Sequence, residues 1–144
     1  NYAIDKHECI HNLCYWYYDE YIGIGAGAHS RLHDEVGIQS VMMSHKPEGW
    51  LKMVLEEGHG IQAKTYLSKK EIVEEMLMMG TRLADGISIS KFCKTTGGNL
   101  YDILNLETIK QYVEKGLVVM SSEKLHLTDK GLILHNYLVP RMLI

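Results

Sequence analysis

The residues that can do chemistry are concentrated between positions 11 and 31. His11 to Trp16 reads H-N-L-C-Y-W, and Tyr21 to Arg31 follows with glycines at three alternate positions. A neutral imidazole is a common ligand of haem iron, and flanking aromatic rings suit a flat macrocycle. Alternating glycines allow another group to approach the backbone closely. The residue types therefore make His11 a candidate haem ligand, alongside several other interpretations.

Two zinc sites compete with the haem interpretation. Residues 7–11 match the H-E-x-x-H pattern of zinc proteases, with Glu35 as a candidate third ligand. Against this, Asp5 and Lys6 charge the face that such a helix would bury. A structural zinc site is the other alternative, with ligands of the usual types but without the usual paired spacing: His7, Cys9, His11 and Cys14.

The glycine segment also fits a dinucleotide fingerprint. Residues 23–28 match G-x-G-x-x-A, which binds a pyrophosphate only where a helix opens directly after it. Residues 29–37 have no helical apolar face. The sequence therefore favours a strand end beside a ligand, with the strand at Tyr21–Gly25.

The elements around these residues fall into two groups. Residues 1–18 lack clean periodicity, which suits an ordered loop, and strands are expected at 21–25 and 36–43 as the edge of a larger sheet. After them the caps and apolar spacing predict helices and one hairpin. The expected elements are a helix from Pro47 to Gly58, a helix opened by the Ser68–Glu71 capping box, a short helix after Ser88, a helix capped by Asn105, a hairpin at 117–127, and a helix capped by Thr128 that Pro140 kinks or ends. This order is typical of a winged helix.

Charge argues against a nucleic-acid partner. The net charge of −3 divides into −5 for residues 1–59 and +2 for residues 60–144. A net charge of +2 is small for a segment that binds a phosphate backbone. The helix over 106–115 carries two lysines and two glutamates, which favours protein packing. A winged-helix interaction or DNA-binding module stays an alternative function.

Cysteine and apolar content indicate the compartment. Three cysteines form an odd and sparse set, so a disulfide framework is not expected and the chain is predicted to be reduced and cytoplasmic. No apolar run reaches the length of a transmembrane segment. The dense motif begins within about ten residues of the first residue, so we expect a fragment of a longer protein.

The same residues resemble a known family. The H-N-x-x-Y-W element at 11–16 and the glycine segment at 19–31 resemble the radical-SAM haem chaperones of the HemW family, also described as oxygen-independent coproporphyrinogen III oxidase-like proteins. The resemblance continues through 45–50 and 75–87. It extends to 127–131 with Asn136 and so covers essentially all 144 residues.

This resemblance implies a fold and a site. The expected fold is α+β and mainly α, with residues 1–45 as the C-terminal edge of a radical-SAM partial TIM barrel and 46–144 as a helical, winged-helix-like domain. It implies that His11 binds haem iron in a setting that comprises Asn12, Tyr15 and Trp16. It also implies that Ala28 and His29 lie near S-adenosylmethionine.

The resemblance further implies a chaperone that binds haem and delivers it to acceptor proteins. The alternative within the family is an oxygen-independent coproporphyrinogen III dehydrogenase. The family's 4Fe-4S cluster uses C-x₃-C-x₂-C, whereas Cys9 and Cys14 are a C-x₄-C pair and Cys93 lies far away. We therefore expect no iron–sulfur ligand and no radical chemistry in this chain alone. We also expect oligomers through the truncated barrel edge.

Overall fold

The computed structural model describes residues 3–4 and 6–144, which form two compact units. The helical unit comprises the described residues up to Tyr18 together with Ile72–Ile144, and the sheet unit comprises Asp19–Glu71. Residues 1, 2 and 5 of the predicted N-terminal domain, and with them the charge of Asp5, lie outside the described part. The expected assignment of residues 1–45 to a barrel edge stays a prediction.

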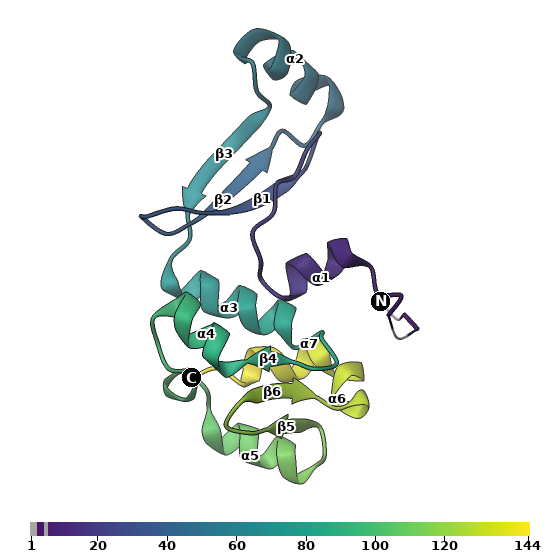
Figure 1. The fold of residues 1–144 in the computed structure, drawn as a ribbon, viewed down its shortest axis with the longest axis vertical. Helices are drawn as coiled ribbons and strands as arrows, with labels where there is room; N and C mark the ends of the chain where they lie inside the picture. Colours follow the sequence, from purple (N-terminus) through teal and green to yellow (C-terminus); the bar gives the residue numbers. More distant parts are fainter. Residues whose placement is uncertain (1–2, 5) are drawn as a thin grey trace. The chain divides into compact units, whose positions relative to one another are not determined.

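The sheet unit is a three-stranded antiparallel sheet with one helix (Figure 1). Its strands are β1 (His29–His33), β2 (Ile38–Met43) and β3 (Ile61–Tyr66), in the order β1-β2-β3. Helix α2 (Pro47–Glu57) connects β2 to β3, and it starts and stops as the sequence predicts. Because β3 pairs with β2, the unit continues past the predicted boundary after residue 45.

The predicted strand at Tyr21–Gly25 is wrong. Only Tyr21 makes a bridge there, to Arg31, and the regular strand begins at His29. Gly25 has a φ of +103°, and the N–H of Ala28 donates to the Gly25 carbonyl over 3.2 Å. The glycines therefore make a turn that leads into β1.

Strand β3 was missed by the sequence analysis. Its residues read I-Q-A-K-T-Y, and half-buried Ile61 and Ala63 alternate with exposed Gln62 and Lys64. The alternation is present but short, and its apolar members are few. The strand is therefore stabilised mainly by its backbone hydrogen bonds to β2, which the sequence pattern does not reveal.

The helical unit combines short helices with a second antiparallel sheet of order β4-β6-β5 (Figure 1). Its elements are α1 (Ile10–Trp16), the continuation of α3 (Lys69–Gly80), β4 (Ile87–Ser88), α4 (Ile89–Thr96), η1 (Leu100–Asp102), α5 (Leu106–Glu114), β5 (Val118–Met120), β6 (Lys124–Leu127), α6 (Asp129–Ile133), α7 (His135–Leu138) and η2 (Val139–Arg141). Phe92, Leu77, Leu100 and Leu125 are completely buried in it. The chain is thus a mixed fold of helices and antiparallel sheets, in agreement with the expected α+β class.

The caps predicted at Asn105 and Thr128 are confirmed, and Ser88 caps the short helix that was expected after it. Oδ1 of Asn105 accepts the N–H of Thr108 over 3.0 Å, and Oγ of Ser88 accepts the N–H of Lys91 over 3.4 Å. Thr128 caps α6 through the N–H of Gly131. These bonds join near neighbours in the chain, which is why the sequence could predict them. Within the part of the chain that the structure describes, no helix combines the length and apolar character needed to cross a membrane.

The capping box of α3 gives a prediction about acid stability. Oε2 of Glu71 accepts from the N–H and the hydroxyl of Ser68, both over 2.7 Å, and these hydrogen bonds lower the pKa of Glu71 below 4.5. A lowered folded-state pKa adds stability that is present above the unfolded-state pKa and lost as pH falls through the folded-state value. We expect the melting temperature of Glu71→Gln to lie below that of the unaltered chain at pH 7 and to converge with it below about pH 4.5. Melting curves between pH 7 and 3 test this, and a constant difference would contradict it.

Candidate functional site

The H-N-x-x-Y-W residues lie on a helix, where the sequence analysis expected a loop. Helix α1 is closed by backbone bonds from Leu13 N to Cys9 O, 3.0 Å, and from Tyr17 N to Leu13 O, 2.8 Å. Residues four apart on a helix share a face, so the motif is divided into an His11–Tyr15 pair and an Asn12–Trp16 pair.

This helix also decides the zinc interpretations. Helix α1 begins at Ile10, so His7 precedes it, and the helical H-E-x-x-H arrangement of a zinc protease is not formed. Among the residues that the structure describes, no three His, Cys, Asp or Glu side chains come together as a set that could hold a metal ion. The four-ligand zinc site is therefore not assembled either.

His11 and Tyr15 form a close pair on an exposed face of α1. The hydroxyl oxygen of Tyr15 lies 2.5 Å from Nε2 of His11. The two rings meet edge to face, with centroids 4.5 Å apart and planes at 87°. His11 is exposed, and the neighbouring Ile10 side chain is 83% exposed. This face thus presents an imidazole and an aromatic ring outward, and the exposed Ile10 lies on a neighbouring side of the helix.

Asn12 and Trp16 line a cleft of about 510 Å³ within the helical unit. Neither His11 nor Tyr15 is among the residues that line it. Its walls come from the N-terminal segment, the turn after α3, and α6: Ala3, His7, Glu8, Cys9, Asn12, Leu13, Trp16, Arg82, Leu83, Ala84, Asp129 and Leu132. The structure therefore brings the four predicted haem residues onto one helix without gathering them in one pocket.

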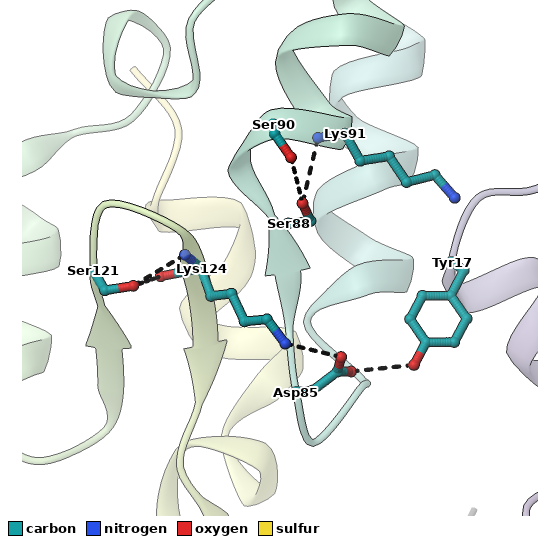
Figure 2. A network of polar contacts seen from close by, with 7 residues as sticks. All are labelled: Tyr17, Asp85, Ser88, Ser90, Lys91, Ser121 and Lys124. Atoms are coloured by element: carbon teal, nitrogen blue, oxygen red, sulfur yellow. Dashed lines mark hydrogen bonds and ion pairs between the residues drawn. The ribbon is translucent and has the colours of Figure 1, made fainter.

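Two tyrosines after α1 attach it to the rest of the helical unit. The Tyr17 hydroxyl donates to Oδ1 of Asp85 over 3.4 Å, and Nζ of Lys124 donates to Oδ2 over 3.1 Å (Figure 2). The Tyr18 hydroxyl donates to Oε2 of Glu75 over 2.8 Å. Burial and the adjacent Asp85 carboxylate raise the pKa of Tyr17, which extends the pH range over which its hydroxyl is a donor. The sequence analysis missed this anchoring role, which the adjacent tyrosines at 17 and 18 hint at only weakly.

Ala28 and His29 lie in the sheet unit. The Ala28 N–H donates to Gly25, and its carbonyl accepts from the Met43 N–H over 2.8 Å. His29 is exposed at the start of β1. A Cβ atom at Gly23 would overlap the carbonyl oxygen of His29. The glycine there is needed for the close approach of two chain segments, which is a structural role.

The surface of α5 bears on the DNA-binding alternative. A groove of about 620 Å³ is lined by residues of α5, the β5–β6 turn and η1: Tyr101, Leu106, Ile109, Lys110, Val113, Glu114, Met120, Ser121 and Ser122. Leu106 is 50% exposed and Val113 is 43% exposed. The charges of Lys110 and Glu114 on this surface cancel. Such a surface is typical of protein contacts, since binding to a nucleic-acid backbone relies on several basic residues.

Comparison with known proteins gives the family. Residues 67–134 match the model of the HemN C-terminal domain. The chain is 30% identical over 136 residues to the heme chaperone HemW of Bacillus subtilis (strain 168), covering 94% of this chain and 35% of that protein. It is 28% identical over 150 residues to the mitochondrial radical S-adenosyl methionine domain-containing protein 1 of Danio rerio, covering all of this chain and 34% of that protein.

A solved structure agrees at the level of the fold. The radical SAM enzyme coproporphyrinogen III oxidase (HemN) from Escherichia coli matches with a TM-score of 0.62 and 15% identity, over 86% of this chain and 28% of that one. The chain thus spans about a third of the length of the curated relatives it matches. With its HemN C-terminal domain and its similarity to HemW over nearly the whole sequence, the chain belongs to the HemW family of radical-SAM proteins.

Proposed function

We propose that this chain is the haem-binding C-terminal part of a radical-SAM haem chaperone, which binds haem and delivers it to acceptor proteins. Several relatives over nearly its whole length are named heme chaperones, which supports this function. The observation that carries it is the exposed His11 imidazole on α1, beside the Tyr15 ring.

These residues fit the chemistry of haem. Histidine is the usual protein ligand of haem iron, and apolar and aromatic side chains suit the faces of a porphyrin. The His11 imidazole is exposed on α1, so a porphyrin can approach it from solvent. An exposed site also leaves haem accessible to an acceptor. In this proposal His11 is the iron ligand, Tyr15 borders it, and Asn12 and Trp16 complete its setting from the adjacent face of α1, where they line the cleft.

Further parts of the proposal concern the longer protein. Ala28 and His29 are proposed to lie near S-adenosylmethionine, and the 4Fe-4S cluster is proposed to lie on a segment outside this chain. Residues 1–45 are proposed to close a partial barrel, with an exposed edge that can pair between copies. The part after residue 45 is proposed to be winged-helix-like, and the location cytoplasmic. The dehydrogenase alternative gains no support from the HemN structure, since 15% identity carries the fold alone.

The substitution His11→Ala in the 144-residue chain tests the proposed function. We expect it to weaken haem affinity by more than about tenfold and to alter the Soret band, because loss of a supporting group around a metal ligand already costs that much. Spectroscopic haem titration measures both quantities. His59→Ala, which removes an exposed histidine of the sheet unit, is the matched control and should leave both unchanged. Unaltered affinity and spectrum in His11→Ala would sink the assignment.

A further inference from the structure

The hydroxyl of Tyr15 contacts the same imidazole nitrogen that haem iron would use. Nε2 is the outermost nitrogen of a histidine side chain, and in His11 it lies 2.5 Å from the Tyr15 oxygen. A neutral imidazole has one N–H and one lone pair. Where Nδ1 carries the proton, Nε2 offers the lone pair, and the Tyr15 hydroxyl donates to it. The same lone pair cannot bind a proton donor and iron together.

We propose that Tyr15 is a latch on the haem site, a positioning residue that competes with iron for Nε2 of His11 and so keeps haem binding reversible. This inference rests on the proposed function, because it concerns how the same site releases its cargo. A chaperone has to give up haem to an acceptor. A donor held beside the ligand nitrogen lowers the affinity for iron and reoccupies the nitrogen when haem leaves.

The geometry supports a latch that opens at low cost. His11 and Tyr15 are one helical turn apart, so both side chains project from one face of α1. The edge-to-face ring contact, 4.5 Å between centroids, brings the hydroxyl to Nε2 without a backbone change. Because the pair lies on the exposed side of the helix, rotation of Tyr15 can exchange the imidazole for water as its hydrogen-bond partner.

The helical spacing determines which residue of the motif can contact Nε2 of His11. A residue at i+1 or i+2 would not face His11, whereas i+4 does. Cys14, at i+3, is half-buried and supplies a thiol instead of a hydroxyl. Of the H-N-x-x-Y-W residues, Tyr15 alone combines the right spacing with a hydroxyl that reaches Nε2. Its phenolic ring explains why a tyrosine is suited to this position, since a shorter hydroxyl side chain could not reach across the imidazole.

Tyr15→Phe in the 144-residue chain tests the latch, since it removes the hydroxyl and keeps the ring. We expect haem to bind about two- to tenfold more tightly, the range that corresponds to the net worth of one hydrogen bond. Transfer of haem to excess apomyoglobin should slow by a similar factor, with the absorption spectrum of the bound haem unchanged. A merely structural role for Tyr15 would weaken binding. Tyr101→Phe, which removes a hydroxyl that donates to Ser121, is the matched control.

Each other outcome overturns the latch. Unchanged affinity in Tyr15→Phe would show that the hydroxyl does not compete. Weaker binding with an unchanged spectrum would indicate that Tyr15 supports the site structurally and does not compete with iron for Nε2. Loss of the spectrum in Tyr15→Phe but not in His11→Ala would make the tyrosine the iron ligand. Absence of haem binding by the unaltered chain would overturn the proposed function itself, whereas the first two outcomes leave that function standing.

Discussion

Replacing Phe92 by alanine is expected to lower the free energy of unfolding by about 3–5 kcal/mol. Phe92 is the sole phenylalanine of the chain, and its side chain is completely buried in the helical unit. On α4 it lies between buried Ile89 and Thr96, so one helix face carries all three. Truncation removes a large apolar area from the core and leaves a cavity that the neighbouring side chains can fill only in part.

Denaturant unfolding followed by circular dichroism measures this loss. Ile133→Ala is the matched control, because it also truncates an apolar side chain on a helix, but that side chain is 81% exposed. Its free energy of unfolding should change by about 0.5 kcal/mol or less. Equal losses in the two variants would contradict the placement of Phe92 in the core.

Replacing Gly86 by alanine is expected to lower the free energy of unfolding by about 2–5 kcal/mol. Gly86 has a φ of +72°, and a left-handed conformation costs a residue with a Cβ atom roughly 1–2 kcal/mol. That Cβ atom would also overlap the carbonyl oxygen of Leu125 and the Cβ of His126, which adds an overpacking cost of about 1–3 kcal/mol. Strand β6 would have to shift away from the turn after α3.

Gly97→Ala separates the two contributions to the Gly86 effect. Gly97 ends α4 with a φ of +62°, and an added Cβ there meets nothing within 4 Å. We therefore expect Gly97→Ala to lose only the conformational term, about 1–2 kcal/mol, with the excess loss in Gly86→Ala arising from the contact with β6. If the two variants were equally destabilised, the close approach of β6 to Gly86 would be refuted. Thermal and denaturant unfolding of both variants give the comparison.

Sequence was most informative where the stabilising interaction is local. The caps at Ser88, Asn105 and Thr128 bond to backbone N–H groups three residues away, and each begins a helix as predicted. Gly58 and Gly97 end helices in left-handed conformations for the same local reason. The H-N-x-x-Y-W element indicated the family before any contact was known. These signals need only the residue types and their spacing.

The site itself depended on contacts between distant segments. Residues 1–18 lack clean periodicity, so a loop was expected, and Cys9 makes no side-chain cap hydrogen bond in the structure. What attaches α1 are the hydrogen bonds of Tyr17 and Tyr18, which reach residues 68 and 57 positions away. Periodicity and capping carry no information about such partners.

The sequence by itself thus determined most helices after residue 46, the hairpin, the family, and the residue types at the candidate haem site. Only the tertiary structure decided that the motif is helical, that His11 and Tyr15 share an exposed face, and that Asn12 and Trp16 face a cleft. It also showed that Gly23 serves the approach of two backbone segments. The physical reason is one of range: caps and turns are fixed by neighbours in the chain, whereas the orientation of α1 is fixed by side chains that only folding brings close.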